Sequence, residues 1–247
     1  MMKTNHLCCL FIGNGDSMSP AANVPKPIRR RDPESTRASI LDAAQVCLAR
    51  DGAEGVSVSS VAKIAGVNRG TAYQHFQSKE ALIQATLERV SLELMAAVFA
   101  EDEHVDAFVA DKMNISTIAK GMMVFNLRLA EFTVENPDMS RIWLFDLLSR
   151  ENPEQDPFYK RFLEGLRAFV LNDMCEPGVD PETLAVTILS GYFMWPIWVS
   201  SHAKTKKERQ KQARRMAHEV VRIQCFGVFK NVDDNFVNNA LNEVIGL

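Results

Sequence analysis

The spacing of helix-capping residues between positions 57 and 78 constrains the fold more than any other feature of the chain. Ser57, Asn68 and Ser78 each stand just before a helical pattern, where a side-chain oxygen can accept from unpaired N–H groups of a first turn. Gly66 ends the first pattern, because glycine readily takes the left-handed conformation that closes a helix. The sequence therefore predicts short helices at about 58–65 and 69–75, and a longer one from Lys79 to about 100.

A helix precedes these elements. Ile40, Leu41, Ala44 and Leu48 recur at helical spacing over about 34–51, and Gly52 ends the pattern. A short helix, a glycine turn and a second short helix then form a helix-turn-helix, in which the second helix enters the major groove of DNA. A plain three-helix bundle with solvated polar positions is the alternative.

The second short helix, "NRGTAYQHF", carries side chains suited to reading DNA. Arg69 can donate two hydrogen bonds to guanine, Gln74 can pair with adenine, and Thr71 can meet a base or a phosphate. The remaining candidates on this face are Gly70, which allows close backbone approach, and Tyr73 and His75, whose polar tips suit phosphate oxygens. Ala72 and Phe76 point to the domain core.

Charge supports an anionic partner for this end of the chain. Between Ser60 and Lys79 there are three basic residues and no acidic one, and Lys79 stands in a first helical turn, where a nearby phosphate would favour it. Residues 1–89 carry 11 Lys and Arg against 8 Asp and Glu, whereas the whole chain has a net charge of −3. The body is therefore acidic.

The rest of the chain shows helical patterns and no competing strand pattern. Proline or capping residues separate the expected helices, which lie at about 105–111, 114–135, 137–150, 157–175, 181–203, 206–230 and 233–245. The predicted fold is all-α: a disordered tail at 1–28, a three-helix helix-turn-helix domain at 29–80, and a larger helical domain at 81–247. The basic run at 204–215 is interpreted as a solvated helix start.

Residues 37–82 resemble the N-terminal domain of the tetracycline-repressor (TetR/AcrR) family of transcription regulators. Three ordered groups carry the resemblance: Ala62-x-x-Ala65-Gly66-Val67, Gly70-Thr71-x-Tyr73-x-x-Phe76 and Ser78-Lys79-Glu80-x-Leu82. Two positions depart from the family pattern, since Leu48 stands where phenylalanine is frequent and Ser60 where an acidic residue is common. Both departures concern local packing and not the reading surface.

The resemblance implies recognition of a palindromic DNA operator by Arg69, Thr71, Tyr73, Gln74 and His75, with phosphate contacts from Ser57 and Lys79. Arg29, Arg30 and Arg31 would form either an arm reaching a neighbouring groove or a solvated linker. It further implies a homodimer through the helices at about 181–203 and 206–230. The alternative for 181–203, which is apolar over almost its whole length, is a central core helix of the monomer.

The resemblance also implies that the larger domain binds a small effector. Aromatic residues, among them Phe145, Phe169, Phe193 and Trp198, give this domain an apolar interior, which suits an apolar or amphipathic effector. The candidate effector-binding residues are Phe125, Arg128, Phe132, Trp143, Phe162, Tyr192 and Trp195, with Asn126, Glu131 and Arg141 as further polar anchors. Any single aromatic residue at helical spacing is more often part of the core than of a pocket.

Two other classes of function remain as alternatives: an enzyme, and an effector sensor that no longer binds DNA. No GxSxG, HExxH or phosphate-loop pattern occurs, and the five histidines and five cysteines show no metal-ligand spacing. We therefore expect no catalytic residues, metal or cofactor, no membrane partner, and a cytoplasmic location. Effector binding is expected to release DNA, and the resemblance to the family implies that the regulator is a repressor.

Overall fold

The computed structural model describes residues 32–100, 115–230, 235 and 239. The chain divides into two units, Met1–Asp32 and Pro33–Leu247, and all the described helices belong to the second. The described residues form helices and no strand, so the predicted all-α class is confirmed. The tail at 1–28, the arginines 29–31, the helix expected at 105–111 and most of that at 233–245 lie outside the described residues.

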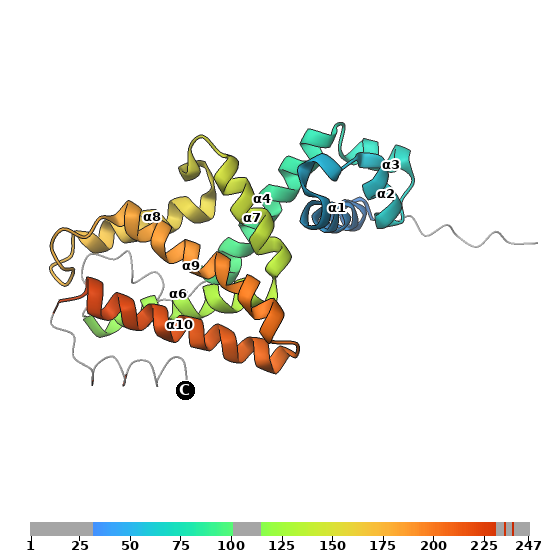
Figure 1. Cartoon of the computed structure of the whole chain (residues 1–247). Coiled ribbons are helices and arrows are strands. Elements are labelled where there is room, and N and C mark those ends of the chain that lie inside the picture. The colour runs from blue at the N-terminus through green and yellow to red at the C-terminus, as the bar shows by residue number, and fades with distance from the viewer. Residues whose placement is uncertain (1–31, 101–114, 231–234, 236–238, 240–247) are drawn as a thin grey trace, which may run out of the picture. The chain divides into compact units, whose positions relative to one another are not determined.

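The first four described helices (Figure 1) are α1 (Pro33–Gly55), α2 (Val58–Ala65), α3 (Arg69–His75) and α4 (Lys79–Val98). Helices α2, α3 and α4 begin directly after the predicted caps, and α2 ends at Gly66. The backbone N–H groups of Ser60, Thr71 and Ala81 donate to the side chains of Ser57, Asn68 and Ser78 at 3.1, 2.7 and 3.1 Å. Gly66 ends its helix in the left-handed conformation, with φ 66° and ψ 32°.

Helix α1 contains an interruption at the residue where the sequence predicts its end. Gly52 has φ 67° and ψ −175°, which is not helical, and the helix assignment resumes as far as Gly55. Regular helix therefore stops before Gly52. Glycine suits this position, because residues that carry a side chain rarely adopt such a positive φ.

The other described helices of the unit are α6 (Ile115–Glu135), α7 (Pro137–Ser149), α8 (Pro157–Val170), α9 (Pro181–His202) and α10 (Lys206–Val228), with a short 3-10 helix at Pro153–Gln155. The expectation that the helix from 157 continues to 175 was wrong. The chain instead turns after α8, and Cys175 forms an isolated β-bridge with Phe229. The Glu176 N–H donates to the Val228 carbonyl at 2.8 Å, so backbone pairing with the end of α10 replaces the last helical turn.

Helix α4 is shared by the helix-turn-helix and the helical body. Leu82, Thr86, Val90, Leu94 and Val98 follow at four-residue intervals and are all fully buried. The helix packs against α1 and also against α6, α7 and α8. The expected domain boundary between residues 80 and 81 falls in its first turn.

Arg89 joins α4 to α1 on the outer side of this contact. Its guanidinium donates to Asp42 Oδ1 at 2.8 Å and to Gln45 Oε1 at 2.9 Å. The arginine side chain is only 21% exposed, so these charge-assisted hydrogen bonds are partly shielded from water and stabilise the contact between α1 and α4.

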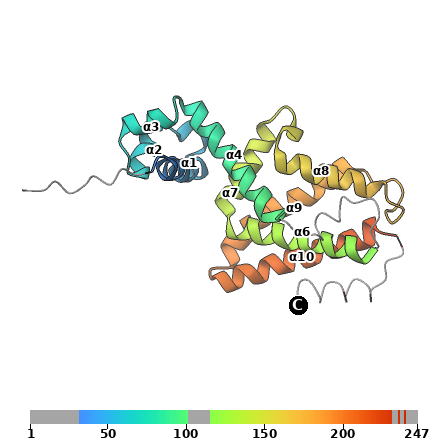
Figure 2. The same cartoon turned by 180° about the vertical axis from the view of Figure 1, so that it is seen from behind.

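The body has an aromatic core crossed by one chain of polar side chains. Trp143 stacks on Phe193 with ring centroids 4.3 Å apart, and Phe125 on Phe162 at 4.9 Å. Between α6, α9 and α10, which Figure 2 shows from behind, the Tyr192 hydroxyl donates to Asn126 Oδ1 at 2.6 Å, and Asn126 Nδ2 donates to Gln224 Oε1 at 3.0 Å. Burial raises the pKa of Tyr192 well above its usual value, so the hydroxyl stays protonated as a donor.

Replacing Tyr192 with phenylalanine removes one hydroxyl and leaves the buried Asn126 Oδ1 without its donor. We expect the free energy of unfolding to fall by about 1–3 kcal/mol, the cost of an unsatisfied buried polar atom. Urea unfolding at fixed protein concentration measures this, with Tyr73→Phe as the matched control because the Tyr73 side chain is exposed. Equal stability of both variants would show that the polar chain contributes nothing to the fold.

Candidate nucleic-acid interface and ligand cavities

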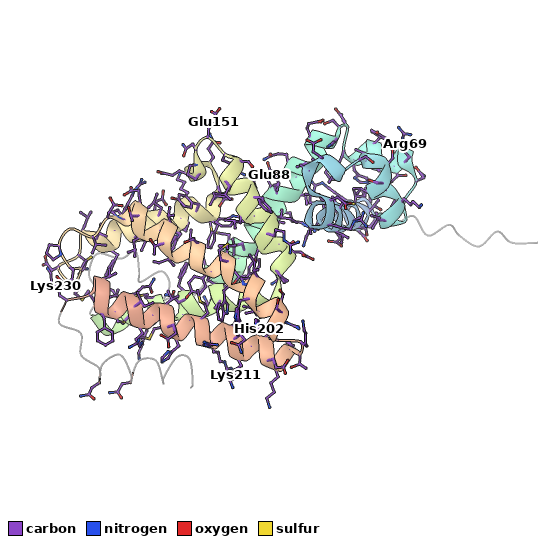
Figure 3. The ribbon with its side chains drawn as sticks, viewed as in Figure 1. Arg69, Glu88, Glu151, His202, Lys211 and Lys230 are labelled. Atoms are coloured by element: carbon purple, nitrogen blue, oxygen red, sulfur yellow. The ribbon has the colours of Figure 1, made fainter. Side chains whose placement is uncertain are left out.

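Helix α3 turns one face to the domain core and the other to solvent. Ala72 is fully buried and Phe76, its C-cap, is 4% exposed, as the sequence predicts. On the opposite face Arg69, Gly70, Tyr73 and Gln74 are exposed, and Thr71 and His75 are half-buried. Figure 3 shows Arg69 at the start of this helix. The candidate reading residues therefore share one accessible surface, which we call the α3 face.

The start of α3 is held tightly at its N-cap. Asn68 Oδ1 accepts from the Thr71 N–H at 2.7 Å, and a Cβ added at Gly70 would lie 3.3 Å from that same oxygen. Glycine at position 70 therefore leaves room for the cap. Arg69 is placed by its own helix, since its guanidinium lies 5.4 Å from the centre of the Tyr73 ring, one turn later.

The two expected phosphate contacts also have structural partners. Ser57 caps α2, and Ser60 completes a capping box by accepting from the Ser57 N–H at 3.2 Å. Serine at position 60 thus does at this helix what an acidic residue does in other capping boxes. Lys79 Nζ donates to the Glu54 carbonyl at 3.3 Å, so the lysine that the sequence assigns to a phosphate also caps the end of α1.

A small cavity of about 20 Å³ lies in the body between α6, α8, α9 and α10. Its walls include Phe125, Phe162, Leu184 and Ile188, and its polar atoms come from Asn126 and Gln224. The volume is enough for about one water molecule, so a larger ligand requires the walls to move. No ionisable side chain is among its lining residues.

The structure brings together only part of the candidate effector set. Phe125 and Phe162 line the cavity, and Tyr192 reaches it through its bond to Asn126. The others lie elsewhere: Phe132 and Trp143 in the core, Arg128 donating to the Ala100 carbonyl, and Trp195 donating to the Gln212 carbonyl. Sequence reasoning missed Gln224, because a glutamine on an amphipathic helix gives no sign that it faces the core.

Two residues expected in the interior of the body lie at its surface. Phe145 is 62% exposed. Arg141, expected as a polar anchor for the effector, donates instead to the Ala49 carbonyl of α1 at 3.2 Å. Both line a second, larger cleft between α1, α4 and α7. Helix α7 turns these two side chains toward α1, a contact that helical periodicity alone does not indicate.

Helices α9 and α10 together present an exposed apolar surface, which we call the α9–α10 face. It consists of Val186, Met194, Ile197 and Trp198 on α9 and Ile223 and Phe226 on α10, each between 37% and 67% exposed. Trp198 stacks on Trp195 and on His202, which Figure 3 places at the end of α9. By length and composition α9 is the one helix in the described ranges that would be able to cross a membrane, and it packs against α6, α8 and α10.

Comparison with known proteins identifies the first part of the chain. Residues 40–86 match the model of the family described as bacterial regulatory proteins, tetR family. The nucleoid occlusion factor SlmA of Glaesserella parasuis is 26% identical over 122 residues, which cover 49% of this chain and 55% of that protein. The regulator TtgR of Pseudomonas putida is 36% identical over 59 residues, covering 24% and 28%. The chain thus spans about half the length of SlmA and less of TtgR.

The fold extends the likeness beyond the first domain. The crystal structure of a gamma-butyrolactone receptor (an ArpA-like protein) superposes with a TM-score of 0.59, at 21% identity, over 87% of this chain and 98% of that one. Together with the capped helices and the exposed α3 face, these matches define a helix-turn-helix protein of the DNA-binding class. Residues 40–86 are therefore identified as the N-terminal domain of the tetR family of bacterial regulatory proteins, and the chain shares its overall fold with the solved receptor structure.

Proposed function

We propose that this protein is a sequence-specific transcriptional repressor, released from a palindromic operator when a small effector binds the helical body. The observation that carries the proposal is the α3 face, where donor side chains are accessible on a helix that is buried on its other side. The proposed units are the helix-turn-helix at 29–80 and the effector-binding and dimerisation region at 81–247. The proposal includes a cytoplasmic location and requires no metal, cofactor, membrane or catalytic step.

For the α3 face and the neighbouring helix starts, the proposed roles follow from side-chain chemistry. Arg69 and Gln74 have the planar donor and acceptor pairs that read guanine and adenine, and Thr71 meets a base or a phosphate. The phosphate contacts are proposed for Tyr73, His75, Ser57 and Lys79, with Gly70 at the closest backbone approach. Phosphate contacts set register and orientation, whereas Arg69 and Gln74 supply the sequence preference.

Arg69→Ala is expected to weaken binding to the preferred duplex by about 5- to 150-fold per contact, because a bidentate base contact is lost. Lys79→Ala is expected to weaken preferred and scrambled duplexes alike and to reduce the salt slope by about 1. Fluorescence anisotropy on duplexes chosen by genome-fragment selection measures both.

Arg214→Ala is the matched control, because it removes the same charge from an exposed position on α10. Failure of the wild-type protein to enrich any fragment would contradict the repressor proposal. It would favour a sensor that does not bind DNA, or an enzyme whose turnover is unaffected by the Arg69 change.

We propose a homodimer through the α9–α10 face. An exposed apolar surface on adjacent helices is unusual on a monomer and typical of a protein interface. Pairing with the same face of a second copy would cover it and form a four-helix arrangement. A two-fold dimer also places two α3 helices on one duplex, which is what a palindromic operator requires.

Ile197→Glu is expected to convert the dimer into a monomer, because each protomer would bury an unpaired carboxylate in an apolar interface. Ile197 is 63% exposed in the single chain, so the change leaves the monomer core intact. Analytical ultracentrifugation measures the mass, with Leu92→Glu as the control because Leu92 is an exposed leucine on α4. A variant that remains dimeric would place the interface elsewhere.

We propose that the effector enters the cavity between α6, α8, α9 and α10 and is uncharged. The lining offers stacked aromatic rings and the amides of Asn126 and Gln224, with no ionisable side chain to neutralise a charged ligand. Burying an unpaired charge there would cost more than the apolar contacts contribute. A flat apolar compound with one carbonyl or hydroxyl satisfies both features.

Uncharged aromatic ketones, lactones and phenols are therefore expected to release DNA, whereas their carboxylate analogues are not. Leu184→Trp is expected to abolish this release by filling the cavity, and Leu171→Trp, at an 86% exposed position, to leave it unchanged. Anisotropy of the protein–DNA complex during ligand titration measures the effect. A coupling free energy of about 1–3 kcal/mol between effector binding and DNA binding would change the affinity for DNA about 5- to 150-fold. Release by the charged analogues alone would contradict the choice of cavity.

A further inference from the structure

A cleft much larger than the core cavity lies outside the body core. This cleft, of about 560 Å³, lies between the C-terminal part of α1, the first half of α4 and the exposed side of α7. That volume is in the range of small-molecule sites. The cleft shares no lining residue with the cavity proposed for the effector.

The cleft has an apolar floor. Leu48 of α1, Ile83 and Leu87 of α4 and Ile142 of α7 line it, and Phe145 adds an aromatic ring that is 62% exposed. An exposed phenylalanine beside an apolar hollow keeps hydrophobic area in contact with water, and covering that area with a ligand is favourable. The occupant therefore has an apolar and preferably flat body.

The accessible charge at the cleft is positive. Three ionisable side chains line it: Arg50 and Arg141, which are 66% and 55% exposed, and Asp146, which is 15% exposed. Asp146 pairs with Arg150 at 2.7 Å, and that pairing neutralises it. Of these lining side chains, a ligand entering from solvent meets the two arginines and not Asp146. Asp51 and Asp138, the partners of the arginines, are not among the lining residues.

Arg141 is the better placed of the two arginines to hold an anion. Arg50 is already paired with Asp51 at 2.6 Å. The carboxylate nearest to Arg141 is Asp138 at 3.7 Å, too long for a hydrogen bond, and its Nη1 donates to a neutral carbonyl, that of Ala49. The guanidinium therefore retains donors for a ligand, and its ion pair with Asp138 is longer than the pair between Arg50 and Asp51.

We propose that this cleft is a second small-molecule site, for an amphipathic acid with a flat apolar body over Phe145 and its carboxylate on Arg141. This proposal goes beyond the proposed repressor function, because it concerns a separate site. The core cavity is proposed for an uncharged ligand, whereas the cleft is proposed for an anionic one. Its walls come from α1 of the helix-turn-helix and α7 of the body, so a bound acid would bridge the two.

Isothermal titration with 1-naphthoate tests the site, with 1-naphthalenemethanol as the uncharged probe of the same shape. We expect naphthoate to bind with a Kd of about 1 mM or tighter, as a ligand of this size allows. The alcohol is expected to bind at least about fivefold more weakly, because it makes no charge-assisted hydrogen bond.

Two variants locate the bound probe. Arg141→Gln is expected to weaken naphthoate at least about fivefold, whereas Arg222→Gln, an arginine equally exposed and also beside a carboxylate, leaves it unchanged. Ala53→Trp is expected to block the cleft from an exposed position, and Ala97→Trp on α4 is its control. Circular dichroism checks that each variant is folded.

Naphthoate binding that survives Ala53→Trp would place the probe elsewhere and overturn the proposal, as would absence of binding to the wild-type protein. Equal binding of the alcohol, or no effect of Arg141→Gln, would overturn the assignment of an acid. The titration contains no DNA, so these outcomes do not depend on whether the protein binds an operator.

Discussion

The burial of one continuous stripe on α4 is the constraint on which the rest of the structure depends. Leu82, Val90, Leu94 and Val98 are all buried on one face of this helix, which packs against α1 of the helix-turn-helix and against α6, α7 and α8 of the body. Because these side chains share a rigid element, the two cores cannot rearrange independently. Arg89 reinforces the arrangement by binding α1. In the proposed switch, a change in the body reaches the α3 face through α4 and through the contact of α7 with α1.

Local capping explains why the reading helix has a definite structure despite its short length. A helix of seven residues is not stable alone, since nucleation costs more than so few hydrogen bonds return. Asn68 satisfies its first turn, and the burial of Ala72 and Phe76 holds it on the domain. The side chains proposed to touch DNA therefore project from a backbone that is already organised.

Charge divides the two ligand sites proposed for this chain. The core cavity offers only amides as polar side-chain groups, and Asn126 links Tyr192 to Gln224 by two hydrogen bonds. The cleft at α1, α4 and α7 is open and has arginines at its edge. Removing a carboxylate from water costs much free energy in the core and little beside an exposed arginine. An uncharged compound would therefore bind in the core cavity and an acid in the cleft.

The sequence by itself determined the all-α class, the helix-turn-helix, its caps and the family, because each of these depends on local spacing: Ser57, Gly66, Asn68 and Ser78 act within one turn of themselves. The inward position of Ala72 and Phe76 follows from the same helical period. Only the tertiary structure decided the end of α8, where pairing of Cys175 with Phe229 replaces helix, and the surface position of Phe145. It also decided that Gln224 faces Asn126 and that Arg141 meets α1. These outcomes depend on contacts between residues far apart in the chain. Helical periodicity predicts which residues lie on the same face of a helix, but not which other helix packs against that face.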